Sequence, residues 1–144
     1  MLVNDDACFA CGQNNPYGLH LQFSCADDTG KVSTIFVPNK TYQGWKDIVH
    51  GGIILTVLDE AMAKAAGERG YHVLTGQIQA KFKAPARVQQ KLVCEAEIVD
   101  VKRSIIYARS RVVTDGGIVI AEATAKMVIA DTAAAYESAL AGTE

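Results

Sequence analysis

An aspartate follows an apolar stretch of the sequence, shortly after a pair of glycines. Asp59 comes directly after the run Ile53–Leu58. Gly51 and Gly52 precede that run and follow His50. A carboxylate partly withdrawn from water can act as a base near neutral pH, and free N–H groups at a helix start can stabilise an oxyanion. These residue types at this spacing could therefore perform acid–base chemistry on a carbonyl group.

Each of these residues also has a purely structural interpretation. Asp59 could border a solvated helix edge, because Glu60 and Lys64 are four residues apart in the favourable order for an exposed ion pair. A glycine pair more commonly forms a tight turn, and a single histidine such as His50 is more often a hydrogen-bonded structural residue than a base. The residues alone leave both interpretations of Asp59 open.

The elements that would position these residues are one helix and several strands. The segment from Gly51 to Arg69 is rich in Ala, Leu, Ile and Met, and glycines close to its end suit a helix C-terminus. Alternating apolar residues and turn signals predict six strands, two before the helix and four after it: Leu19–Ala26, Lys31–Val37, Thr75–Ala84, Lys91–Val101, Ser104–Thr114 and Ile118–Ala130. We therefore predict an α+β fold with an antiparallel sheet wrapped around one long central helix.

The length, net charge and apolar runs of the sequence argue against several classes of protein. The 144 residues are enough for one domain, and a net charge of −2 gives no footprint for binding a nucleic-acid backbone. No apolar run reaches the length of a membrane span, and the N-terminus lacks the pattern of a signal peptide. We therefore expect a cytoplasmic protein with reduced thiols.

We expect three segments along the chain. Residues 1–18 are rich in Cys, Asn, Gly and Pro and indicate an irregular N-terminal arm. Residues 19–131 would form the folded domain. Residues 132–144 are an Ala-rich tail that could form a short helix or fray.

The cysteine pair in the arm raises the question of a metal. Cys8 and Cys11 form a C-x-x-C motif, which supplies two of the four ligands that zinc requires. Cys25 and Cys94 could complete a set, but the apolar neighbours of Cys94 indicate a core position. We therefore expect no metal, and a glycine-bearing turn that holds the arm against the sheet.

A longer pattern around Asp59 resembles a known family. His50-Gly51-Gly52, followed by Leu58-Asp59-Glu60-Ala61, is similar to the HGG…D signature of hotdog-fold acyl-CoA thioesterases of the phenylacetate-degradation (PaaI) and thioesterase-superfamily type. The nine-residue step from His50 to Asp59 matches that branch. The arm sequence CFACGQNNPYGLHLQF also resembles the N-terminal segment of one PaaI-like subgroup.

The resemblance implies a hotdog fold that hydrolyses a coenzyme A thioester without a cofactor. Asp59 would be the nucleophile or the general base, and the N–H of Gly51, together with Gly52, would polarise the thioester carbonyl. His50 would shape the turn or contact the substrate. Thr75 would help to place the water, and would come from the other subunit of a dimer.

The resemblance also implies partners and a binding surface. Two protomers would pair their sheets with active sites at the interface, and a homotetramer is favoured over a dimer. Coenzyme A carries phosphates, so Arg87 and the turn at Lys102 and Arg103 would bind it. The alternative for these basic residues is simple solvation of strand ends.

Two other functions stay open for such a chain. It could be a hotdog protein that binds acyl-CoA without cleaving it, because such a protein would keep the same pocket. A hydratase or dehydratase is less favoured, because Asp59 lacks a His at the spacing those enzymes use. The acyl chain of the substrate depends on two subunits and is not predicted.

Overall fold

The predicted helix forms at the expected place. The computed structural model describes residues 2–26, 28–130 and 133–142, and within it α1 spans Gly51–Glu68. Its buried positions recur every three or four residues, as expected of a helix with one broad apolar face. They are Ile54, Val57, Leu58, Ala61, Met62, Ala65 and Ala66. The side chains of Leu58, Ala61 and Met62 are fully buried, so this face is the centre of the core.

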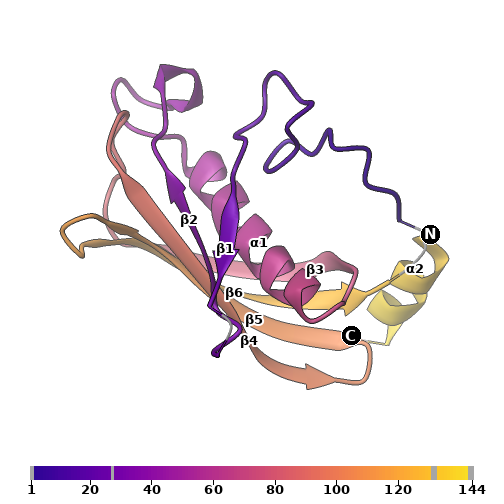
Figure 1. Ribbon diagram of the computed structural model, residues 1–144. Coiled ribbons are helices and arrows are strands. Elements are labelled where there is room, and N and C mark those ends of the chain that lie inside the picture. The colour runs from indigo at the N-terminus through magenta and orange to yellow at the C-terminus, as the bar shows by residue number, and fades with distance from the viewer. Residues whose placement is uncertain (1, 27, 131–132, 143–144) are drawn as a thin grey trace.

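The six predicted strands also form, and they build one antiparallel sheet. They are β1 (Phe23–Cys25), β2 (Val32–Phe36), β3 (Val73–Phe82), β4 (Leu92–Lys102), β5 (Ile105–Thr114) and β6 (Val119–Ile129). Their order across the sheet is β1-β2-β4-β5-β6-β3. The sheet curves around α1, which lies along one of its faces (Figure 1). The prediction of an antiparallel sheet wrapped around one central helix is therefore confirmed.

Strand β3 lies at one edge of the sheet and runs back beside α1. It pairs with β6 along its length, from Val73 opposite Ile129 to Phe82 opposite Ala121. The register shifts between Thr75 and Gln77, so Gly76 forms a bulge. Within the described chain, no strand pairs with the other edge of β3. A ten-residue unpaired edge is long for a sheet that stands alone.

The first strand is much shorter than predicted. The sequence alternates from Leu19 to Ala26, but only the last part pairs with β2. The N–H groups of Leu19 and Leu21 instead donate to the carbonyls of Phe9 and Ala10, at 2.8 and 2.9 Å. Leu21 is nevertheless buried, so the apolar alternation predicted the burial of its side chain correctly and its strand pairing wrongly.

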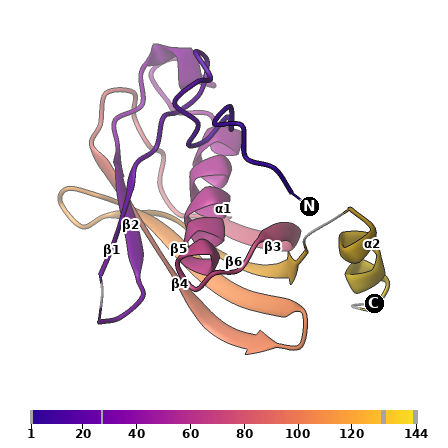
Figure 2. The ribbon, with the colours of Figure 1, turned by 45° about the vertical axis from the view of Figure 1, so that its right-hand side comes forward.

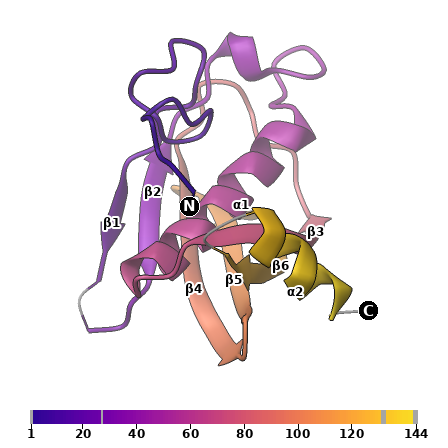
Figure 3. The same ribbon diagram turned by 90° about the vertical axis from the view of Figure 1, so that its right-hand side faces the viewer.

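The remaining segments lie at the two ends of the chain and before α1. A 3-10 turn, η1 (Lys40–Tyr42), precedes α1. The tail forms α2 (Ala133–Ala141), which packs against β6 beside the start of β3 (Figures 2 and 3). The expected boundary between domain and tail, at residues 131 and 132, lies outside the described residues. Among the described helices, none is both long and apolar enough to cross a membrane.

Candidate active site

The start of α1 carries a histidine cap. His50 is the N-cap residue, and the N–H of Gly52 donates to its Nδ1 atom at 2.9 Å. The His50 N–H in turn donates to the Tyr42 carbonyl at 2.8 Å, which fixes the turn in front of the helix. His50 thus lies where it shapes the turn, and its Nδ1 lone pair is occupied.

The cap separates the roles of the two glycines. The Gly52 N–H is already bonded to His50, whereas the N–H of Gly51 has no acceptor among the described residues. A Cβ atom at Gly51 would lie 3.7 Å from the Phe82 ring, in ordinary contact. The structure therefore leaves one free donor at this end of the helix, where the sequence suggested two.

Asp59 lies two turns further along α1 and faces β3. The Thr75 hydroxyl donates to Asp59 Oδ1 at 2.6 Å, and both side chains are partly buried. A hydroxyl donor to a carboxylate at this distance is a strong, orienting contact. The resemblance assigned Thr75 to the opposite subunit from Asp59, and the structure corrects this, because the two residues meet within one chain.

Gly51 and Asp59 do not meet within one chain. Eight residues of helix separate them, which at a rise of 1.5 Å per residue is about 12 Å. A thioester carbonyl is only a few ångströms across, so it cannot reach the Gly51 N–H and the Asp59 carboxylate of the same helix. The structure thus brings together Asp59 with Thr75, and separately Gly51 with Phe82.

A small apolar hollow opens beside Gly51. Its volume is about 350 Å³. The apolar side chains that line it come from three segments, and they are Ile48, Val49, Ile54, Phe82, Ala84, Pro85, Ala86 and Ile120. Gly51, whose N–H has no acceptor among the described residues, is one of the residues that line this hollow.

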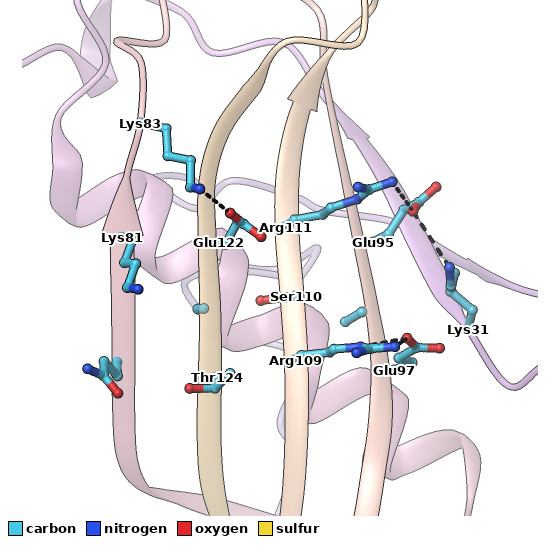
Figure 4. Close-up of a pocket in the computed structure, with 13 residues that line it drawn as sticks. Lys31, Lys81, Lys83, Glu95, Glu97, Arg109, Ser110, Arg111, Glu122 and Thr124 are labelled. Carbon is cyan, nitrogen blue, oxygen red and sulfur yellow. Dashed lines mark hydrogen bonds and ion pairs between the residues drawn. The ribbon is translucent and has the colours of Figure 1, made fainter.

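A larger hollow lies on the outer face of the sheet, on the side away from α1. Its volume is about 680 Å³, and it is lined mainly by charged side chains from four neighbouring strands (Figure 4). Glu122 pairs with Lys83 at 2.8 Å, and Arg109 Nε donates to Glu97 at 2.7 Å. These charges satisfy one another, and Asp59 lies across the sheet from them, so this hollow is a solvated sheet face.

The predicted phosphate-binding residues lie at opposite ends of the sheet. Arg87 follows β3, and its backbone forms an isolated antiparallel β-bridge with Ile48, next to the apolar hollow. Lys102 and Arg103 form the β4–β5 turn, beyond the end at which β3 begins. Lys102 lies 3.6 Å from Asp100. One chain therefore does not gather the three cations at one place.

Cys8 and Cys11 lie beside Glu60, which the sequence pattern placed on a solvated edge of the helix. Ligand atoms of Cys8, Cys11 and Glu60 all lie within 4.8 Å of one another. The arm covers Glu60, whose side chain is only 16% exposed. Burial, together with the hydrogen bond and charge of Glu60, raises the pKa of the Cys11 thiol to about 12, so this thiol is no nucleophile at neutral pH.

The other two cysteines lie elsewhere. Cys94 is buried, with its thiol directed at the Val57 carbonyl, as the core prediction required. Cys25 lies in β1. No local sequence pattern linked Glu60 to the arm, because the two segments are almost fifty residues apart and meet only through folding.

The family model of the thioesterase superfamily matches residues 46–121, which is more than half of the chain. The matched part begins just before His50 and includes Gly51, Asp59 and Thr75. No curated protein sequence is significantly similar to the chain.

Solved structures with the same fold are numerous. A thioesterase superfamily protein superposes with a TM-score of 0.80 at 21% identity, over 85% of this chain and 60% of its own. The PaaI protein of the E. coli phenylacetic acid degradation operon gives 0.72 at 16% identity, over 78% and 80%. A hypothetical thioesterase from Streptococcus pneumoniae, crystallised with coenzyme A, gives 0.69 at 16% identity, over 75% and 88%.

The streptococcal protein has also been crystallised as two variants. In one an aspartate is replaced by alanine, and in the other a threonine sixteen positions further along is replaced. At these identities the structural likeness establishes the fold, and the match to the family model establishes membership. The chain has the hotdog fold and belongs to the thioesterase superfamily.

Proposed function

We propose that this protein hydrolyses acyl-CoA thioesters, with Asp59 as the general base or nucleophile. The observation that carries the proposal is the Asp59–Thr75 pair, in which a partly buried carboxylate is oriented by a hydroxyl at 2.6 Å. Such a carboxylate has one oxygen fixed and can direct the other at water or at a carbonyl carbon. This geometry supports a hydrolytic role for Asp59.

The oxyanion donor in this proposal comes from a second copy of the chain. α1 and β3 run antiparallel, so that Gly51 lies beside Phe82 at one end and Asp59 beside Thr75 at the other. Two β3 edges that pair antiparallel about a twofold axis bring the start of each strand beside the end of the other. The partner's Gly51 then approaches Asp59, and a single carbonyl can reach both.

Dimer formation also satisfies the unpaired edge of β3. The backbone groups on the open edge of this ten-residue strand would become hydrogen-bonded, and the two sheets would become continuous. The apolar hollow beside Gly51 would be closed by the partner and would hold the acyl chain or the pantetheine arm. The partner's Arg87 would come to the end of the sheet where Lys102 and Arg103 lie, which places three cations on one side for the coenzyme A phosphates.

The reaction follows from these positions. The free Gly51 N–H donates to the thioester oxygen and stabilises the negative charge that develops on it. In the general-base route, Asp59 takes a proton from water as that water attacks the carbonyl carbon, and Thr75 holds the carboxylate in place. The carbon–sulfur bond breaks, coenzyme A leaves as a thiol after gaining a proton, and the acyl group leaves as a carboxylic acid.

Relatives support this assignment of chemistry. The streptococcal protein was crystallised with coenzyme A, and its two alanine variants replace an Asp and a Thr with the same spacing as Asp59 and Thr75. A second candidate function is a binder of acyl-CoA that does not cleave it. That function would keep the hollow and the cations, but it would give the Asp59–Thr75 pair no task.

The decisive experiment measures release of free thiol from a panel of acyl-CoA esters. We expect turnover by the wild type, and a fall in kcat of at least about a hundredfold in Asp59→Asn, which removes the base and keeps the shape. Asp115→Asn is the matched control, because it makes the same change in an exposed hairpin turn. Stoichiometric binding of acyl-CoA without turnover by the wild type would establish the binder instead.

A complementation experiment tests the two-chain site. Gly51→Pro removes the N–H at the first helical position, where proline is well tolerated, while Gly51→Ala keeps the N–H. We expect kcat to fall about 10²–10³-fold in Gly51→Pro and by much less in Gly51→Ala.

Refolding Gly51→Pro together with Asp59→Asn should then restore activity. Half of the dimers would be mixed, and each would carry one intact site, so roughly a quarter of wild-type activity is expected. No recovery, from a mixture shown to contain mixed dimers, would contradict a site shared between chains.

A further inference from the structure

The cluster of Cys8, Cys11 and Glu60 is unused by the proposed reaction. Two thiols from the N-terminal arm and one carboxylate from α1 converge to within 4.8 Å of one another, and all three residues are partly buried. Sulfur and carboxylate oxygen are zinc ligands, at about 2.3 and 2.1 Å respectively. At those lengths the ligands of a tetrahedral site lie about 3.5–4 Å apart, so small side-chain adjustments complete the geometry.

Backbone contacts of the arm hold the two thiols in place. The Gly12 N–H donates to the Cys8 carbonyl at 2.9 Å, which closes a turn around the pair. A Cβ atom at Gly12 would lie 2.4 Å from the Cys8 nitrogen, so only glycine allows this turn. Ala10, between the two cysteines, is buried, and its carbonyl accepts from the Leu21 N–H at 2.9 Å.

We propose that Cys8, Cys11 and Glu60 bind one Zn²⁺ ion, which clamps the N-terminal arm to α1. Water would be the fourth ligand. Both thiols would release their protons to solvent on binding the metal. Two thiolates and a carboxylate would then carry three negative charges, of which the ion compensates two. Lys64, whose Nζ atom lies 3.9 Å from Glu60, compensates the third. This balance accounts for the position of a lysine beside a set of anionic ligands.

The position on α1 gives the ion a structural task. Glu60 and Asp59 are neighbours in sequence, so their side chains leave the helix about 100° apart. Asp59 faces Thr75 on β3, whereas Glu60 faces the arm. The ion thus lies away from the site of hydrolysis, and its loss would loosen the arm without removing a reacting group.

The test uses the full-length protein, reduced and freed of metal with a chelator, and loaded with Zn²⁺ or Co²⁺. We expect one equivalent of metal by mass spectrometry, and a sulfur-to-cobalt charge-transfer band with Co²⁺. Cys8→Ser and Cys11→Ser should each lower the affinity at least about tenfold, whereas Cys25→Ser, the control, should leave it unchanged. A band that survives the double Cys8→Ser and Cys11→Ser variant would overturn the proposal.

A second measurement needs no variant. Zinc should slow alkylation of Cys8 and Cys11 by iodoacetamide, read by peptide mass spectrometry, and should leave the rate at Cys25 unchanged. Equal alkylation with and without zinc would overturn the proposal. So would protection that persists after chelation and disappears only with a reductant, because it would reveal a disulfide between the two cysteines.

Discussion

Asp59 and Glu60 are adjacent acids on one helix, and the fold gives them different surroundings. Asp59 accepts from the neutral hydroxyl of Thr75, on a strand that forms the open edge of the sheet. Glu60 lies under the arm beside two thiols and a lysine. The first arrangement leaves a carboxylate oxygen for a substrate, and the second surrounds a carboxylate with groups that suit a metal ion.

Two consecutive positions of one helix can thus face entirely different surroundings. A step of one residue turns the side chain by about 100°, so the partners of neighbouring residues are set by different elements. The two proposals can therefore be tested separately, because each rests on a different side of α1.

The largest expected effect is the loss of turnover in Asp59→Asn, which distinguishes the role of Asp59 from that of Glu60. Asp59→Asn should lower kcat by about 10²–10⁴-fold and keep the cobalt–thiolate band, since its side chain does not face the arm. The double variant Cys8→Ser and Cys11→Ser should lose the band and retain turnover within about tenfold of the wild type. Loss of both properties in both proteins, with the fold intact by circular dichroism, would show that the two sides of α1 act as one site.

A smaller effect is expected at the hydroxyl that orients Asp59. Thr75→Ala should lower kcat by roughly 10–100-fold, because a hydrogen bond to a charged group contributes about 1.5–3 kcal/mol. Thr75→Ser keeps the hydroxyl and should recover most of the activity. Equal activities of the Ala and Ser variants in steady-state assays would mean that Thr75 only fills space.

On the other side of α1, Lys64→Met should weaken zinc binding by only a few-fold. The lysine is 40% exposed and 3.9 Å from Glu60, a distance at which two charges in water interact by about 1 kcal/mol. Competition against a fluorescent zinc chelator measures the change. Lys31→Met, which alters an exposed ion pair far from the arm, should have no effect and is the control.

The smallest effect belongs to an ordinary ion pair on the outer face of the sheet. The hydrogen bond from Arg109 lowers the pKa of Glu97, so this pair stabilises the fold above the ordinary glutamate pKa of 4.5 and loses its effect as the pH falls below it. Glu97→Gln should cost less than about 1 kcal/mol in urea unfolding at pH 7, and progressively less as the pH falls below 4.5 and Glu97 becomes protonated. A larger cost at pH 7 would show that this face is more than a solvated surface.

Much of the fold followed from local pattern. The helix at Gly51–Glu68 and the strands β2 to β6 lie within two residues of their predicted bounds, because apolar periodicity and turn glycines act over a few neighbours. Strand β1 was predicted too long, because its first residues bond to the arm and no periodicity encodes that choice. The tail forms a helix, one of the two outcomes that its composition allowed.

The sequence predicted only part of the candidate site, because local patterns do not encode contacts between distant segments. The sequence alone determined that Asp59 lies on a helix that starts at Gly51, since both facts depend on spacing along one chain. The long-range contacts appear only in the folded chain: Thr75 meets Asp59, and Glu60 lies beside Cys8 and Cys11. Those contacts depend on which surfaces pack together, and packing is a property of the whole folded chain.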